Sequence, residues 1–372
     1  MTVYDALVIG GGVMGAGTAL GLARGGMRVL LLDRKGLGTG ASGVNAGTLS
    51  LQIKRAVLVP YALRGRERWA EAHRLLGVDV HYRMTGGLTL AFSEAEAAIL
   101  ETRMAERKAA GVPLEIISGD RAREMEPAIG PRALLASYCA IDGYADSTAT
   151  GRAYRAALLA AGVTLHEGDG VAALERTGAG FALRTGRGAS FEGHRLVLAA
   201  GAWTHRLARL LGVELPMVVR FNMVSVTERA QRLATMTIGH ATGLLTLKQS
   251  DNGTVLIGGG WQGRGDPERD ESDILPENLL TNLRLAATAV PALRRTRLVR
   301  SWIGYEAHVP DFLPLAGALP GVQDAWLLAC VRGGYTIGPY ISEMLATHIL
   351  GNDTELPLFD PGRFNSAAVA AA

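Results

Sequence analysis

The feature that most constrains this chain is a glycine cluster close to its N-terminus. Residues 10–15 (GGGVMG) follow the apolar run Tyr4–Ile9 and fit the pattern G-x-G-x-x-G. The run predicts a buried parallel strand, and the residues from about Met14 to Gly25 predict a helix. A second apolar strand, Arg28–Leu32, leads into Asp33, eighteen residues after the last glycine of the cluster. The order of strand, glycines, helix, strand and acid predicts a dinucleotide-binding βαβ unit of the Rossmann type.

Each part of this unit has a physical reason. Gly10 permits a sharp turn, Gly12 lets the backbone approach a pyrophosphate, and Gly15 allows close packing of helix on strand. Asp33 is placed to accept hydrogen bonds from a ribose diol. The unit does not by itself distinguish FAD from NAD. Arg34 either faces the 2′-phosphate of an NADP-type ligand or is a solvated arginine at the strand end, which we prefer.

Length and charge narrow the class of protein. With 372 residues the chain favours two domains, or one domain with a large insertion. Its net charge of +3 is small and its basic residues are scattered, so no nucleic-acid partner is expected. The uncharged stretch Ala6–Ala23 follows Asp5 rather than a basic segment, and we expect neither a signal peptide nor a transmembrane helix. The two cysteines, Cys139 and Cys330, are too few for a disulfide framework, a Cys-rich zinc site or a self-contained iron–sulfur cluster, and they fit a reducing cytoplasm.

Three further segments carry a resemblance to a known family. They are residues 38–47 (GTGASGVNAG), 196–203 (LVLAAGAW) and 325–339 (AWLLACVRGGYTIGP). Together with the N-terminal unit they resemble the D-amino-acid-oxidase superfamily, which includes glycine oxidase, sarcosine oxidase and D-amino-acid dehydrogenases. The segments SGVNAGTLSLQIKR and MTGGLTLA are most similar to flavoprotein subunits of the opine oxidase, hydroxyproline dehydrogenase and hydrogen cyanide synthase type.

This resemblance implies non-covalently bound FAD and an α/β fold, with a Rossmann-type FAD-binding domain and an inserted antiparallel-sheet substrate domain. We expect the FAD-binding domain to comprise residues 1–83, 141–217 and 297–372, and the substrate domain residues 84–140 and 218–296. Apolar runs between Arg220 and Gly260 predict the inserted sheet, and Glu94–Ala110 predicts an exposed helix. The expected FAD-binding residues are Gly10, Gly12, Val13, Met14, Gly15, Asp33, Arg34, Ala41, Ser42, Asn45, Ala46, Gly47, Val171, Ala200, Gly201, Trp203, Gly333, Gly334, Tyr335, Thr336 and Ile337.

One position departs from the family pattern. Glycine-oxidase-like members carry a carboxylate-binding arginine in a block similar to G-x-R-P-x-T-P-D, whereas residues 304–311 here read GYEAHVPD. Glu306 therefore stands in the place of that arginine. It either faces a cationic part of the substrate, such as a secondary amine or a guanidinium, or pairs structurally with a nearby arginine.

The substrate carboxylate then needs another cation. The candidates are Lys54, Arg55 and Arg332, with Arg55 and Arg332 preferred because bidentate arginine recognition fixes orientation. Tyr305 and His308 are expected to line the pocket, and His308 either accepts a proton from the substrate ammonium or is structural.

The resemblance implies oxidation of a small amine or amino acid of the proline, hydroxyproline, N-substituted amino acid or opine class. Hydride would pass to flavin N5, and the resulting imine would be hydrolysed. Sarcosine oxidases place an oxygen-activating lysine where Leu256 stands here, which favours a dehydrogenase. Subunits of this type work with flavoprotein and iron–sulfur partner subunits, in the cytoplasm or peripherally at the inner membrane. The alternative is a flavin-binding scaffold or electron-transfer subunit without its own substrate turnover.

Overall fold

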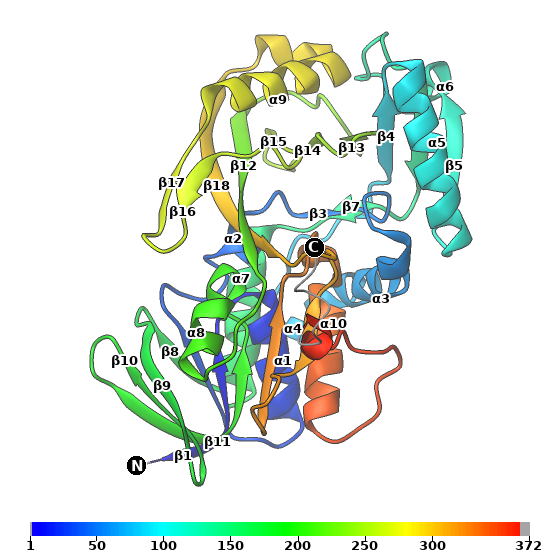
Figure 1. Cartoon of the computed structure of the whole chain (residues 1–372). Coiled ribbons are helices and arrows are strands. Elements are labelled where there is room, and N and C mark those ends of the chain that lie inside the picture. Colours follow the sequence, from blue (N-terminus) through cyan, green and yellow to red (C-terminus); the bar gives the residue numbers. More distant parts are fainter. Residues whose placement is uncertain (1, 365–372) are drawn as a thin grey trace.

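The computed structural model describes residues 2–364. Two large sheets dominate the molecule, one in the lower half of Figure 1 and one in the upper half. No helix among the described residues is long and apolar enough to cross a membrane.

The first sheet has a parallel centre with the strand order β19-β20-β11-β1-β2-β8, and β10 and β9 extend from β11. Leu30, Leu31 and Leu32 of β2 are at most 1% exposed, because helices or strands cover both faces of the sheet. The predicted strands and helix of the N-terminal βαβ unit are observed within one or two residues of their predicted bounds. The strands are β1 (Val3–Ile9), β2 (Val29–Asp33), β8 (Thr164–Glu167), β9 (Val171–Thr177), β10 (Gly180–Thr185), β11 (Ser190–Leu198), β19 (Leu315–Ala318) and β20 (Ala325–Ala329).

Helix α1 packs closely against α10 because two of its glycines face that helix. A Cβ atom on Gly17 would lie 2.1 Å from Ser342 Oγ, and one on Gly21 would lie 2.6 Å from the Cβ of Ala346. The helices associated with this sheet are α1 (Val13–Arg24), α2 (Ala41–Val44), α3 (Val59–Ala70), α4 (Ala72–Leu76), α7 (Ser147–Ala160), α8 (Thr204–Leu210) and α10 (Gly334–Ile349), with the short 3-10 helices η1 (Ala56–Leu58), η2 (Gly201–Trp203) and η4 (Pro361–Phe364).

The second sheet has the order β18-β12-β15-β14-β13-β4-β6-β5. It is antiparallel except at β4 and β13, which pair in parallel and join the two inserted segments. Its strands are β4 (Gly87–Ala91), β5 (Leu114–Ser118), β6 (Leu135–Cys139), β12 (Val218–Arg229), β13 (Thr237–His240), β14 (Thr246–Gln249), β15 (Thr254–Gly258) and β18 (Leu298–His308). The division into domains at residues 84, 141, 218 and 297 stays a prediction, and β18 pairs with β12 in this second sheet although its residues were assigned to the FAD-binding segments.

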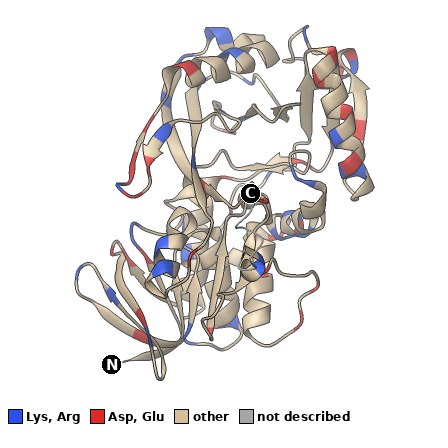
Figure 2. Ribbon diagram, in the orientation of Figure 1, with Lys and Arg blue, Asp and Glu red and all other residues tan. Residues whose placement is uncertain are grey.

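Smaller elements complete the chain. Two short antiparallel pairs are β3 (Thr48–Leu49) with β7 (Gly143–Tyr144), and β16 (Arg264–Asp266) with β17 (Glu271–Asp273). Helices α5 (Glu94–Ala109), α6 (Gly119–Met125), α9 (Pro276–Ala289) and the 3-10 helix η3 (Pro291–Arg295) accompany the second sheet. The ribbon in Figure 2 shows that residues of both charge signs are spread over the two halves, with several on α5.

Helix α5 shows how local sequence sets an element. Ser93 caps its N-terminus by accepting a hydrogen bond from the Glu96 N–H, and acidic residues lie in the first turn. Its buried positions are Leu100, Met104 and Arg107, so the face turned to the protein carries a guanidinium. The predicted helix is confirmed, but its buried face is not wholly apolar.

Candidate active site

The start of α1 has the geometry of a phosphate-binding turn. Gly10 has a φ of 112°, and a Cβ atom there would lie 2.3 Å from Ala199 O. A Cβ atom on Gly15 would lie 1.9 Å from Gly10 O, so neither glycine tolerates a side chain. Gly12 precedes the helix without a side-chain cap, and the Val13 N–H donates to Ser42 Oγ at 2.9 Å. The helix N-terminus therefore offers N–H groups and the positive end of the helix dipole to an anion.

Asp33 holds the glycine turn from the end of β2. Its Oδ2 accepts from the Gly11 N–H at 2.7 Å, and its Oδ1 accepts from the N–H groups of Lys35 and Gly36 at 2.9 and 2.8 Å. A carboxylate can accept about four hydrogen bonds. These three contacts leave Asp33 capacity for one more donor, such as a ribose hydroxyl.

Arg34 has partners within the protein. Its guanidinium forms an ion pair with Asp270 at 3.0 Å and lies 3.8 Å from the ring centroid of Trp203. These contacts favour a structural role for Arg34 over recognition of a 2′-phosphate.

A cavity of about 840 Å³, called the central cavity below, extends from the start of α1 to α5 in the second sheet's layer. Its lining includes ten of the residues expected to bind FAD: Val13, Met14, Ala41, Ser42, Asn45, Ala46, Gly47, Gly333, Gly334 and Tyr335. The other expected FAD-binding residues do not line it: Gly10, Gly12, Gly15, Asp33, Arg34, Val171, Ala200, Gly201, Trp203, Thr336 and Ile337. The glycine turn, the N-terminus of α1 and the adjoining cavity fit a bound dinucleotide.

The N-terminus of α10 reaches the same cavity. Gly333 precedes this helix with a φ of 60°, in the left-handed region that glycine adopts without strain. Lys54 Nζ donates to Gly333 O at 2.7 Å, and the Gly333 N–H donates to Glu306 Oε1 at 3.1 Å. Lys54 is only 3% exposed, and burial lowers its pKa to about 8, although the charges of Glu306 and Asp142 oppose the shift. The loop before α10 is thus held between a buried cation and a carboxylate.

Glu306 lines the central cavity from β18. Its Oε2 accepts a hydrogen bond from Asn222 Nδ2 on the neighbouring strand β12 at 2.7 Å. Within residues 2–364 no arginine forms an ion pair with this carboxylate, so the interpretation of Glu306 as a partner of a nearby arginine has no such contact to support it.

Three of the four remaining candidate side chains line the central cavity. Arg332, Arg55 and Tyr305 line the central cavity, and His308 does not. Arg332 is exposed and lies 5.4 Å from the ring centroid of Phe312. The Arg55 guanidinium donates to the carbonyl oxygen of Asp311.

His308 and Tyr305 both make aromatic contacts. The His308 ring stacks on Phe312 with centroids 4.6 Å apart, a contact that favours the structural interpretation of this histidine. The Tyr305 ring packs against Phe221 at 5.0 Å and Trp203 at 5.3 Å. These packing contacts fix the orientation of the Tyr305 ring at the wall of the cavity.

Lys248 was missed by the sequence analysis. It is 3% exposed, its Nζ lies 4.2 Å from the centroid of the Tyr144 ring, and burial lowers its pKa to about 7. A Cβ atom on Gly47 would lie 2.8 Å from this Nζ, so Lys248 contacts the predicted flavin-side loop. Its partner across β14 and β15 is Leu256, the position compared with the sarcosine oxidase lysine. The available signal was a lysine that directly follows the run 243–247 (GLLTL) in a predicted strand.

Both cysteines are buried and free. Burial raises the pKa of Cys330 to about 12, and it raises that of Cys139 further. Cys330 directly follows β20 with a φ of 58°, instead of lying within the strand. In the described part of the chain, no group of three or more His, Cys, Asp or Glu side chains could hold a metal ion.

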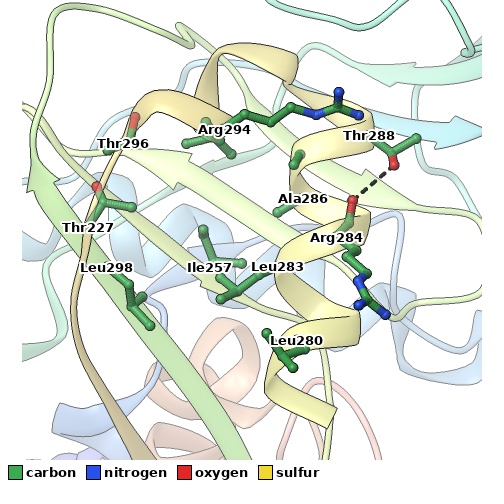
Figure 3. A pocket seen from close by; sticks show the side chains of 12 residues that line it. Thr227, Ile257, Leu280, Leu283, Arg284, Ala286, Thr288, Arg294, Thr296 and Leu298 are labelled. Carbon is green, nitrogen blue, oxygen red and sulfur yellow. Dashed lines mark hydrogen bonds between the residues drawn. The ribbon is translucent and has the colours of Figure 1, made fainter. Parts of the chain in front are cut away.

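A second cavity, of about 430 Å³, lies between α9 and the second sheet. Figure 3 shows that Leu280, Leu283 and Ile257 line it, with Arg284 and Arg294 beside them. It contains none of the candidate residues and is lined by residues outside the glycine-rich loops. We therefore place the active site in the central cavity.

Comparison with known proteins agrees with this geometry. The model of a family described as FAD dependent oxidoreductase matches residues 5–348. One of the subunits of opine oxidase from Agrobacterium tumefaciens (strain Ach5) is 30% identical over 383 residues, covering 98% of this chain and 99% of the relative. Glycine oxidase of Geobacillus kaustophilus (strain HTA426) is 28% identical over 365 residues, covering 95% of each chain.

The solved structures show the same fold. The crystal structure of glycine oxidase from Geobacillus kaustophilus superposes with a TM-score of 0.87 at 26% identity, covering 98% of this chain and 99% of that chain. The L-proline dehydrogenase from P. horikoshii superposes with a TM-score of 0.88 at 24% identity, covering 98% of both chains. The expected fold class and the FAD cofactor are confirmed, and the chain belongs to the family of FAD-dependent oxidoreductases.

Proposed function

We propose that this protein oxidises a small amine or amino acid that carries a substituent on its nitrogen, and that it acts as a dehydrogenase. The observation that carries the proposal is the shared lining of the central cavity. Glu306 lies there with the cations Lys54, Arg55 and Arg332, next to the loops expected to hold FAD. One anion and several cations suit a substrate with an amine and a carboxylate.

Each side chain has a defined task in this proposal. Arg332 binds the substrate carboxylate, because it is the cavity-lining arginine in the loop before α10 and forms no ion pair within residues 2–364. Glu306 accepts a hydrogen bond from the substrate nitrogen and orients the adjacent C–H bond. Tyr305 supplies an apolar wall that limits water. When bound, FAD would accept hydride from that carbon, leaving an imine that water hydrolyses.

The substrate class follows from Glu306. An arginine at position 306 would suit the carboxylate of the substrate. The carboxylate of Glu306 instead suits a secondary amine or another cationic group of the substrate. The opine oxidase and proline dehydrogenase named above act, by their names, on substrates with substituted nitrogens. Proline, hydroxyproline, other N-substituted amino acids and opines are therefore the proposed substrates.

The proposal of a dehydrogenase rests on Leu256 and on the relatives. Leu256 carries no cation that would favour electron transfer to oxygen, and burial lowers the pKa of its cross-strand partner Lys248 to about 7, so that lysine is largely neutral above this pH. Two relatives are named as subunits, of opine oxidase and of hydrogen cyanide synthase. We therefore propose that flavoprotein and iron–sulfur partner subunits receive the electrons.

The test is the visible spectrum of the purified flavoprotein under anaerobic conditions. Proline, hydroxyproline, N-methyl amino acids and opines are added in turn, and air is admitted afterwards. Bleaching by one class supports catalysis, and slow return of colour in air supports a dehydrogenase. If no amine bleaches the flavin, the catalytic proposal is wrong, and a flavin-binding scaffold or electron-transfer subunit is the better description.

A further inference from the structure

The α5 side of the central cavity carries a buried arginine. Arg107 is 8% exposed and shares the inward face of α5 with Leu100 and Met104, where an amphipathic helix ordinarily places apolar residues. Its side chain also lines the central cavity. Arg107 is therefore largely removed from bulk water and lies at the wall of the central cavity.

The Arg107 guanidinium has few partners inside the protein. Among residues 2–364 its one side-chain hydrogen bond is from Nη1 to Arg103 O, at 2.6 Å, and its buried Nε has no partner. No carboxylate of the described residues forms an ion pair with it. A buried charge without a counter-ion is costly, because the protein interior does not replace the water that solvated it. Burial and the charge of Arg103 both lower the pKa of Arg107, and only Glu106 opposes them.

A second arginine increases the positive charge at this place. Arg103 lies one helical turn before Arg107, lines the same cavity, and donates from Nη1 to Ala241 O at 2.6 Å. Like charges four residues apart destabilise a helix. An anion bound between the two guanidinium groups would remove this repulsion and would supply the missing counter-ion.

We propose that Arg107, assisted by Arg103, forms an anion site at the α5 end of the central cavity and binds a second carboxylate of the substrate. This inference rests on the proposed function and narrows its substrate class. The substrate is a secondary amine that bears a carboxylate on each nitrogen substituent. One carboxylate lies near Arg332 beside the loop before α10, the nitrogen lies near Glu306, and the other carboxylate lies at Arg107.

Two matched compounds test the site in the holoprotein. N-(1-carboxyethyl)alanine has two carboxylates, whereas N-ethylalanine lacks the second one. For each compound, the rate of anaerobic flavin reduction at several concentrations gives the reduction rate constant divided by Kd. We expect the dicarboxylate to be preferred by about tenfold or more, which corresponds to one charge-assisted contact. Absence of any preference, while both amines bleach the flavin, would overturn the site and leave the proposed function standing.

Variants then locate the preference. In Arg107→Met we expect a loss of about tenfold or more for the dicarboxylate and less than about twofold for N-ethylalanine. Arg107→Lys should retain part of the preference, and Lys108→Met, the same charge change at an exposed position of α5, should retain all of it. An equal loss for both compounds in Arg107→Met would show that this arginine only supports the helix.

A binding measurement separates the site from the reaction. Diglycolate has an ether oxygen in place of the amine nitrogen and two carboxylates, and methoxyacetate lacks one of them. Calorimetry with the oxidised holoprotein should show tighter binding of diglycolate, reduced in Arg107→Met and unchanged in Lys108→Met. This pattern without bleaching by any amine would support the anion site and refute the proposed function. Equal affinity for both ethers in the unaltered protein would refute the anion site.

Discussion

Lys54 and Glu306 hold Gly333 from two sides, with Lys54 Nζ bound to Gly333 O at 2.7 Å and Glu306 Oε1 bound to the Gly333 N–H at 3.1 Å. The two side chains come from segments about 250 residues apart in the sequence. A side chain at position 333 would disturb this arrangement, because a Cβ atom there would lie 2.6 Å from Lys54 Nζ. The loop before α10 is therefore positioned by Lys54 and Glu306, which belong to two segments far from it in the sequence.

Lys54→Met should weaken FAD binding by about tenfold. The substitution removes a charge-assisted hydrogen bond to Gly333 O, a contact of about 1.5–3 kcal/mol, and frees the loop expected to face the flavin. Titration of the apoprotein with FAD, followed by flavin fluorescence, measures the change. The exposed Lys108→Met variant is the control, and an unaltered Kd in Lys54→Met would show that the loop keeps its position without this contact.

The Kd of a carboxylate substrate, obtained from flavin reduction, should rise as the pH rises through about 8. Lys54 has its pKa lowered to about 8 by burial, so its positive charge is present below this value and lost above it. Loss of the cation weakens attraction of a carboxylate substrate and leaves Glu306 without its nearby positive charge. Stopped-flow reduction between pH 6 and about 9.5 checks the profile. The inflection should be absent in Lys54→Met, and its persistence there would assign it to another group.

Lys248→Met should stabilise the protein at neutral pH. The folded-state pKa is about 7 and the ordinary lysine value is 10.5, so the folded state binds fewer protons than the unfolded state between these values. The stability of the unaltered protein therefore rises with pH across this window, and the cost of burying charged Lys248 is complete only below about pH 7.

Thermal unfolding measures this effect. We expect Lys248→Met to raise Tm by about 3 °C or more at pH 6.5, with the difference shrinking toward pH 10. Lys108→Met controls for removal of an exposed charge. A Lys248→Met variant that is less stable by the same amount at both pH values would contradict burial as the source of the lowered pKa.

Gly15→Val should abolish FAD binding. The first added atom would lie 1.9 Å from Gly10 O, so the glycine turn must move away from the helix N-terminus. The ratio of flavin to protein absorbance in the purified protein measures occupancy. Gly178→Ala is the control because no atom lies within 4 Å of its added Cβ, and it should retain full occupancy.

Neither cysteine should react with a thiol reagent while the protein is folded. Cys139 and Cys330 are buried, and burial raises both pKa values, so the thiolate is scarce and inaccessible. Ellman's reagent should label two thiols in denaturant and none, within minutes, in buffer. Rapid labelling of the native Cys330→Ser variant would show that Cys139 is accessible.

The N-terminal βαβ unit could be predicted from the sequence because its determinants are local. Strand, glycine turn, helix and acid lie within residues 4–33, and the backbone conformation of Gly10 follows from the glycine itself. The three family-like segments extended this prediction to the fold and to FAD, which the comparisons confirm. Strands β12, β14 and β15 were also recognisable as apolar runs broken by turns, whereas β13 (Thr237–His240) was not.

The site depended on tertiary structure, since its charged groups come from distant segments. The sequence named Glu306 and Lys54, but only the fold brought both to Gly333 and buried Lys54 enough to lower its pKa. His308 was a candidate from its motif, yet it ends β18, and the chain that follows brings Phe312 against its ring. Arg107 looked like one more charge on an exposed helix, and its burial beside the cavity followed from how α5 packs on the second sheet. Local pattern determines which elements form, whereas burial and charge pairing depend on which elements meet.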